Sequence, residues 1–198
     1  MTGERMICRK ALVLAGGSSR RMGRDKATLE IDGRTQLERA VTKLRRHVDE
    51  VLVSSRREQA ADPLRARYPQ LFDAYDDLGP LAGILTALES APDDPWLVLA
   101  CDLPRVDDET IEYLLANIDG NSIATAYRSS FDGLPEPLCA VWMPRAVDPV
   151  RAAIAEGTTC PRKILIRAEA TLLSQPVAGA LDNVNTPADL ERVIGTAS

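Results

Sequence analysis

Residues Leu12–Lys26 read LVLAGGSSRRMGRDK. The stretch opens on an apolar run with the composition of a buried β-strand and then reaches the pair Gly16–Gly17. Glycines let backbone N–H groups approach an anion closely, and such loops form concave sites for phosphate oxygens. Arg20, Arg21 and Lys26 add positive charge within a chain whose net charge is −5. The stretch therefore predicts a strand followed by a loop that binds a polyphosphate.

The same stretch matches neither common nucleotide-binding motif. A Walker loop ends in Gly-Lys-Ser/Thr, whereas Lys26 follows Asp25 and precedes Ala27. The pattern G-x-G-x-x-G of dinucleotide-binding folds is absent as well. An ordinary surface turn with scattered basic residues is therefore an alternative. The compact order of strand, glycines, arginines and lysine favours the anion site.

The composition is that of a soluble globular protein. With 198 residues, 45% hydrophobic and 27% charged, we expect a single domain over 1–198. The acidic balance argues against nucleic-acid binding, and no apolar run approaches the about 20 residues of a membrane span. A single histidine, His47, argues against histidine triads and zinc sites. Four widely spaced cysteines without a CxxC pair indicate a reduced, cytoplasmic protein: Cys8, Cys101, Cys139 and Cys160.

Strand-like and helix-like segments alternate along the chain, which predicts an α/β fold with a mostly parallel sheet and helices on both faces. We expect Asp107 to cap a helix, and we expect Asp62–Pro63 to open or interrupt one that is rich in Arg and Ala. The expected strands are 11–15, 51–53, 96–100, 122–126 and 138–143. The other expected helices are 35–47, 81–90, 108–117, 146–156, a short one from Pro161 and a last one after Thr186.

One acidic residue follows the clearest buried strand of the chain. Asp102 comes directly after WLVLAC, at the carboxyl end where α/β sheets bind ligands. An aspartate in this place is costly to bury without a cation or hydrogen-bond donors. A bound triphosphate brings Mg²⁺, which proteins hold with one or two carboxylates. We therefore expect Asp102 to bind Mg²⁺, with a capping role for the turn at 103–106 as the alternative.

Two more groups of polar residues are candidates for the same site. Asp73, Asp76 and Asp77 precede the motif GPLAG, whose glycines would let a nucleotide lie against the backbone. A solvated acidic turn is the alternative. Asn183 and Asn185 are short amides that can bind phosphate or metal-bound water, or can simply shape the turn before the last helix.

Four motifs, in this order, resemble those of the molybdenum cofactor guanylyltransferases: LAGGSSRRMGRDK, GPLAGI, ACDLP and NVNTPADL. The resemblance covers residues 10–194 and implies a three-layer Rossmann-like fold with a mostly parallel mixed sheet. It implies transfer of GMP from GTP to the terminal phosphate of molybdopterin, with Mg²⁺ as cofactor and pyrophosphate as the second product. It also implies transient contact with other proteins of cofactor biosynthesis.

The resemblance assigns part of the site to the nucleoside. Carried over by position, Leu14, Ala15 and Gly16 match the backbone that holds the guanine nucleotide. Gly16 and Gly17 stand where the related cytidylyltransferases read Ala-Gly, which favours guanine. Asp73 matches a nucleotide-contacting aspartate that precedes GPLAG.

The resemblance assigns the rest of the site to the reacting groups. Arg21 and Lys26 match the basic residues that bind the triphosphate, and Asp102 matches the magnesium-binding aspartate. Asn183 and Asn185 match paired asparagines on the pterin side of the cleft. The catalytic residues implied in this way are Arg21, Lys26 and Asp102.

Two positions depart from the family pattern. Ser54 stands where the family often has an asparagine, and Glu136 precedes Pro137 where the guanylyltransferases commonly have histidine. The alternatives are a cytidylyltransferase that acts on the same pterin and a nucleotidyltransferase for another phosphorylated acceptor. A nucleotide-sensing module without catalysis is the alternative outside the enzymes.

Overall fold

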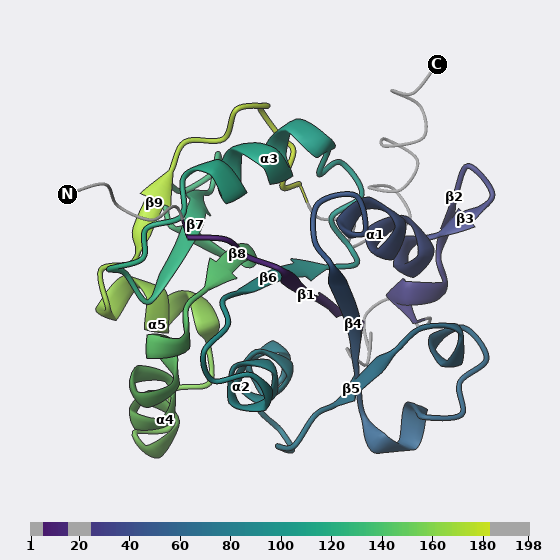
Figure 1. Ribbon diagram of the computed structural model, residues 1–198, viewed down its shortest axis with the longest axis horizontal. Helices are drawn as coiled ribbons and strands as arrows, with labels where there is room; N and C mark the ends of the chain where they lie inside the picture. The colour runs from purple at the N-terminus through teal and green to yellow at the C-terminus, as the bar shows by residue number, and fades with distance from the viewer. Residues whose placement is uncertain (1–5, 16–24, 183–198) are drawn as a thin grey trace.

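A seven-stranded mixed sheet runs through the middle of the molecule (Figure 1), in the strand order β5-β4-β1-β6-β8-β7-β9. The computed structural model describes residues 6–15 and 25–182. Strands β1, β4, β5 and β6 are mutually parallel, whereas β8 runs antiparallel to both of its neighbours, β6 and β7. The strands are β1 (Lys10–Leu14), β4 (Glu50–Ser55), β5 (Gln70–Phe72), β6 (Trp96–Ala100), β7 (Ala124–Arg128), β8 (Pro135–Trp142) and β9 (Thr171–Leu173).

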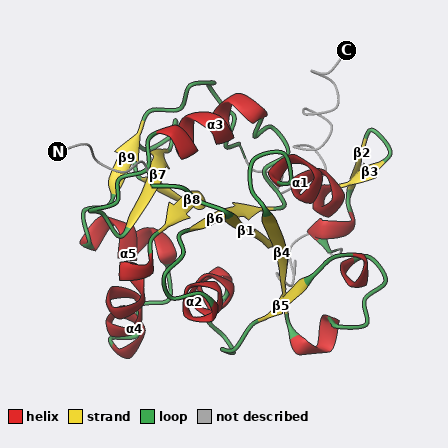
Figure 2. Ribbon diagram, in the orientation of Figure 1, coloured by secondary structure: helices red, strands yellow, loops and turns green. Residues whose placement is uncertain are grey.

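Helices cover both faces of this sheet (Figure 2), which confirms the expected three-layer α/β fold. Helices α1 and α3 pack on one face, and α2, α4 and α5 pack on the other. In β1, Ala11 and Val13 face the first layer while Leu12 faces the second, as the period of two along a strand requires. The helices are α1 (Gln36–Leu44), α2 (Pro80–Ser90), α3 (Asp108–Ala116), α4 (Val147–Ala155) and α5 (Pro161–Arg167).

Short elements join these layers. A two-stranded hairpin, β2 (Glu30–Ile31) and β3 (Arg34–Thr35), precedes α1. Its turn needs positive φ at both central residues, Asp32 at 53° and Gly33 at 71°. The 3-10 turns are η1 (Lys26–Thr28), η2 (Arg57–Gln59), η3 (Arg65–Arg67) and η4 (Pro144–Ala146).

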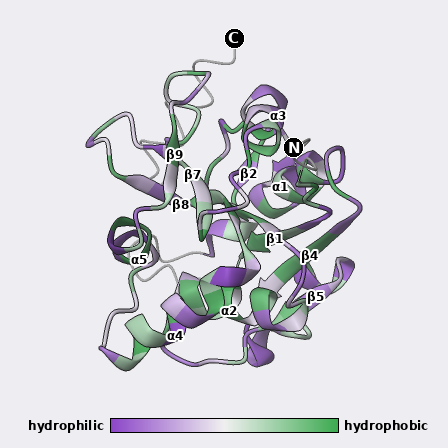
Figure 3. Ribbon diagram, turned by 60° about the vertical axis from the view of Figure 1, so that its left-hand side comes forward, coloured by the Kyte–Doolittle hydropathy of each residue, from purple (hydrophilic) through white to green (hydrophobic). Residues whose placement is uncertain are grey.

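The layer beneath the sheet contains both tryptophans of the chain. Trp96 of β6 and Trp142 of β8 lie opposite each other in the antiparallel register, and they are 1% and 0% exposed. The indole N–H of Trp142 donates to the carbonyl of Pro137 at 3.1 Å. Figure 3 shows hydrophobic residues in green on β4 and on α2, in keeping with a core on both sides of the sheet.

Most elements lie where the sequence predicts them. Asp107 caps α3, because its carboxylate accepts the N–H of Thr110 at 2.9 Å. The prediction of a helix after Asp62–Pro63 is wrong, because only the single 3-10 turn η3 forms there. The carboxylate of Asp62 accepts the backbone N–H of Arg65 at 2.9 Å, which closes a local turn, and the Arg65 side chain turns into the interior. The helix expected after Thr186 lies outside the described residues.

No helix in the described part of the chain is long and apolar enough to cross a membrane.

Candidate active site

The order of the parallel strands creates a switch point between β1 and β6. From β1 the chain proceeds outward to β4 and β5, and it then returns through α2 to the other side of β1 as β6. The two connections leave in opposite directions, and open α/β sheets bind ligands at the carboxyl ends of the strands at such a point. Leu14 and Ala100 are paired in register at these ends, and the N–H of Cys101 donates to the carbonyl of Leu14 at 3.2 Å.

Lys26 and Asp102 meet at this switch point. The Lys26 ammonium donates to Oδ2 of Asp102 at 2.7 Å, and the two side chains are 24% and 18% exposed. Asp102 follows β6 by two residues, and Lys26 opens η1. The structure therefore brings together the acid and one of the cations that the sequence predicts for a single site.

Asp73 lies at the same edge of the sheet, directly after β5. Its carboxylate accepts the hydroxyl of Ser54 at 2.7 Å, and its N–H donates to the carbonyl of Ser55 at 3.0 Å. Burial raises the pKa of Asp73, an effect that the Ser54 hydrogen bond opposes. The strand order places β4 and β1 between Asp73 and Asp102. Asp73 and the Lys26–Asp102 pair therefore lie at the same edge of the sheet, separated by two strands.

Helix α2 packs closely on the ends of β1 and β4. A Cβ atom at Gly83 would lie 2.5 Å from Oγ of Ser54 and 2.9 Å from Cδ2 of Leu14. From the sequence we expect this glycine of the GPLAG motif to make room for a nucleotide. In the structure it instead allows α2 to pack against β1 and β4. Gly79 precedes the helix with φ of +57°, a conformation that favours glycine. The hydroxyl of Thr86 in α2 accepts the N–H of Ala74 at 2.9 Å and so holds the turn that carries Asp73.

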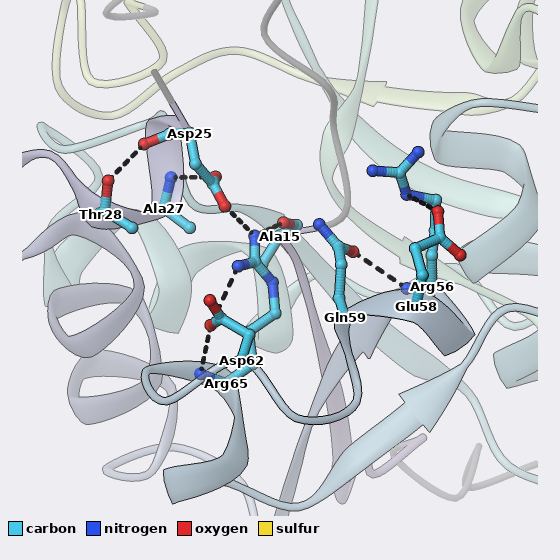
Figure 4. Close-up of polar contacts among 9 residues, drawn as sticks. All are labelled: Ala15, Asp25, Ala27, Thr28, Arg56, Glu58, Gln59, Asp62 and Arg65. Carbon is cyan, nitrogen blue, oxygen red and sulfur yellow. Dashed lines mark hydrogen bonds and ion pairs between the residues drawn. The ribbon is translucent and has the colours of Figure 1, made fainter.

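A buried guanidinium lies between the end of β1 and the residue that caps η1 (Figure 4). Arg65 is 1% exposed and donates through Nη2 to the carbonyl of Ala15 and to Oδ2 of Asp25, at 2.6 Å for Asp25. Its Nη1 donates to Asp62 at 3.2 Å. The hydrogen bonds that Asp62 accepts from Arg65, chiefly from its backbone N–H, lower the pKa of that carboxyl. Sequence reasoning missed Arg65, because an arginine reads as a surface residue and Asp25 is 40 positions away.

Several predicted residues cannot be placed in this geometry. Gly16, Gly17 and Arg21 lie outside the described residues, as do Asn183 and Asn185. Of the other nucleotide-binding candidates, Leu14 and Ala15 lie at the carboxyl end of β1, next to the switch point. Their roles and those of Lys26, Asp73 and Asp102 stay predictions.

The donor set around Asp102 suits a magnesium ion that arrives with a nucleotide. In residues 6–15 and 25–182, no cluster of three or more His, Cys, Asp or Glu could hold a metal by itself. Magnesium bound with phosphates needs only one or two protein carboxylates, since phosphate and water oxygens complete its shell. The Asp102 carboxylate already accepts a hydrogen bond from the Lys26 ammonium and remains partly exposed, so its chemistry fits the binding of Mg²⁺.

Comparison with known proteins points to one family. The sequence profile of the MobA-like NTP transferase domain matches residues 11–172. The probable molybdenum cofactor guanylyltransferase of Methanosarcina acetivorans is 31% identical over 205 residues, covering 95% of this chain and 91% of that protein. The molybdenum cofactor biosynthesis bifunctional protein of Synechocystis is 35% identical over 182 residues, or 92% of this chain. The chain spans about half, 52%, of the length of that second relative.

A solved structure supports the same grouping. The crystal structure of molybdopterin-guanine dinucleotide biosynthesis protein A from Archaeoglobus fulgidus superposes with a TM-score of 0.74 at 27% sequence identity. The superposition covers 95% of this chain and 98% of the other. The similarity therefore extends over the sheet and the switch point together.

Proposed function

The chain belongs to the family of the MobA-like NTP transferase domain, and on this premise we propose that it transfers GMP from GTP to the terminal phosphate of molybdopterin. The observation that carries the proposal is the contact of Lys26 with Asp102, 2.7 Å long, at the carboxyl ends of β1 and β6. A cation and a metal-binding acid side by side are the two groups that a triphosphate requires. Both come from motifs that resemble those of the guanylyltransferases.

The proposed reaction is an in-line displacement at phosphorus. An oxygen of the acceptor phosphate forms a bond to the α-phosphorus of GTP, and the bond from that phosphorus to the bridging oxygen breaks, which releases pyrophosphate. The acceptor is already an anion, so the reaction needs no strong general base. This suits a chain with one histidine, because His47 makes its hydrogen bond to Asp108, at the start of α3.

The protein contributes positioning and charge in this proposal. Lys26 would offset negative charge that grows on the departing pyrophosphate, and Asp102 is the residue that would hold Mg²⁺. Magnesium, when bound, supplies further neutralisation of the phosphate oxygens. Asp73 contacts the nucleoside from the neighbouring part of the same edge. We further place the reaction in the cytoplasm, in transient contact with the other proteins that make the cofactor.

A pyrophosphate-release assay tests the proposal. The purified protein is incubated with Mg²⁺, molybdopterin and either GTP or CTP, and the pterin product is identified by mass spectrometry. The proposal predicts pyrophosphate and a guanine dinucleotide product with GTP, and neither with CTP. A cytosine product, or release that needs no pterin phosphate, contradicts it. Binding of GTP without any release would identify a nucleotide-sensing module instead.

A further inference from the structure

Arg65 is a charged residue in the interior of the protein, and one of its partners, Asp25, caps η1. A guanidinium that is 1% exposed must be paired, because an isolated buried charge is strongly unfavourable. Arg65 has two carboxylate partners, Asp25 and Asp62, and one carbonyl partner, Ala15. Its fork of N–H groups reaches all three at once, which the single ammonium of a lysine cannot do.

Two of these partners belong to the segments that lead to the candidate site. Ala15 follows the last residue of β1, and Asp25 precedes η1. The Nη2 atom of Arg65 bonds both of them, so one nitrogen ties the carboxyl end of β1 to the first residue of the next described segment. Figure 4 shows the guanidinium between Ala15 and Asp25, with Asp62 on its other side.

The link passes through Asp25 to Lys26. The two oxygens of the Asp25 carboxylate accept different donors. Oδ1 accepts the N–H of Ala27 at 3.0 Å and caps η1, while Oδ2 accepts Arg65 at 2.6 Å. Lys26 lies in the chain between Asp25 and Ala27, the two residues that the capping hydrogen bond joins. Arg65 therefore fixes where η1 begins, and η1 carries the ammonium that reaches Asp102.

We propose that Arg65 is a positioning residue that acts through Asp25 to hold Lys26 against Asp102. The catalytic part of this inference rests on the proposed function, whereas the geometric part does not. Asp62 holds the same guanidinium from the side away from η1, and it provides a matched control. Loss of either carboxylate removes one charge from the same buried arginine, but only loss of Asp25 releases η1.

The substitution Asp25→Asn separates the two roles of this residue. Asparagine keeps a side-chain oxygen and is as good a helix cap as aspartate, so the bond from Ala27 survives. One of the two carboxylates that pair with Arg65 is lost. Asp62→Asn makes the same chemical change at the other partner, and Arg65→Lys keeps the charge while it removes the fork. Thermal unfolding identifies the temperature at which all variants are folded.

Pulsed acylation of lysine tests the geometry without any turnover. The chain has four lysines, and Lys163 in α5 is exposed, so it serves as an internal reference. An ammonium held against a carboxylate is shielded from the reagent, so its acylation is slow. We expect the labelling ratio of Lys26 to Lys163 to rise about five-fold in Asp25→Asn and in Arg65→Lys, and to stay within about two-fold in Asp62→Asn. An unchanged ratio in a folded Asp25→Asn protein, or an equal rise in Asp62→Asn, overturns the proposal.

Kinetics then connect the geometry to the reaction. With GTP and molybdopterin, we expect kcat to fall about ten-fold in Asp25→Asn and to change less than about two-fold in Asp62→Asn. A purely structural role of Arg65 would lower the stability of both variants and leave kcat below the unfolding temperature unchanged, which overturns the inference. An inactive wild-type protein sinks the proposed function alone, since the labelling ratios still decide the positioning role.

Discussion

Lys26 and Asp102 are 76 positions apart in the chain, and their side chains meet at 2.7 Å. Neither is fully buried, so the contact alone contributes little to the stability of the fold. A close ion pair of small structural value at the ends of two central strands is better explained by ligand binding than by folding. In the proposed function, this pair places opposite charges where a triphosphate and its metal would both be bound.

Replacement of Asp102 separates these two roles. We expect Asp102→Asn to lower kcat by about 100-fold or more, because a well-placed electrostatic group contributes on that scale, and to leave the unfolding temperature nearly unchanged. Pyrophosphate release and thermal unfolding measure the two effects. Asp49→Asn is the control, since Asp49 makes an exposed ion pair with Arg9 at 3.1 Å. Turnover near the wild-type rate in the Asp102 variant would rule out the metal-binding role.

Asp73 should make stability depend on pH. Burial raises its pKa above the ordinary 3.8, so the folded state binds more protons than the unfolded state between these two values. Stability therefore falls as the pH rises through this window, and the penalty is fully present above it. We expect Asp73→Asn to gain stability relative to wild type at about pH 7 compared with about pH 3, as measured by urea unfolding. If the free energy of unfolding of Asp73→Asn differs from that of wild type by the same amount at both pH values, the raised pKa of Asp73 is contradicted.

At the scale of secondary structure, α2 shows how closely the site and the core are joined. It carries Gly83, which lies against Leu14 and Ser54, and Thr86, which holds the backbone at Ala74. Ser54 in turn donates to Asp73. One helix therefore supports the ends of three strands, β1, β4 and β5. A shift of α2 would move Asp73 and the end of β1 together.

Two opposing effects meet in the variant Gly83→Ala. Alanine is favoured over glycine within a helix by about 1 kcal/mol. The added Cβ would lie 2.5 Å from Oγ of Ser54, and overpacking of this kind destabilises by about 1–3 kcal/mol. We expect the packing effect to win and denaturant unfolding to show a lower free energy of unfolding. Partial recovery in the double variant with Ser54→Ala would identify the contact, whereas a gain of stability in Gly83→Ala would contradict the close packing.

The sequence predicts those elements that have a strong local signal. Long buried runs such as Trp96–Ala100 and capped helices such as Asp108–Ala116 are evident from period and composition. By contrast, β5 and β9 have three residues each, all half-buried, so they show no alternation, and only pairing with β4 and β7 defines them. The hairpin of β2 and β3 is shorter still.

The same division holds for the candidate site. Asp102 is predictable because an acid after an apolar strand needs a partner. Arg65 is not, because its role depends on Asp25, Asp62 and Ala15, which come together only in the folded chain. The close approach of α2 to β1 and β4 also depends on packing. The sequence does not show that Gly83 of the GPLAG motif lies against Ser54 and Leu14. Residues whose role depends on their neighbours in the chain can thus be predicted from the sequence, whereas contacts between distant residues cannot.

For the whole molecule, the strand order matters more than any single residue. The switch point between β1 and β6 puts the ends of four parallel strands along one edge, and α2 closes one side of the sheet beneath them. The antiparallel strand β8 then separates this parallel half from β7 and β9. The candidate site therefore belongs to the parallel half of the sheet, and the other half completes the core.

Nucleotide binding should stabilise the molecule as a unit. A ligand at 100 times its Kd adds about 2.7 kcal/mol to the free energy of unfolding, which raises Tm by about 5–10 °C for a chain of this size. We expect this shift with GTP and Mg²⁺ and a much smaller one with CTP, measured by thermal unfolding. Asp102→Asn should lose most of the gain that depends on Mg²⁺. Equal shifts with both nucleotides would remove the preference for guanine.

The facing pair Trp96 and Trp142 gives the protein an intrinsic optical probe. Both indoles are shielded from water in the layer beneath the sheet, and no other tryptophan is present in the sequence. Their fluorescence therefore reports on that one hydrophobic layer, with blue emission while it is intact and a red shift once solvent enters. Denaturation can be followed without any attached dye.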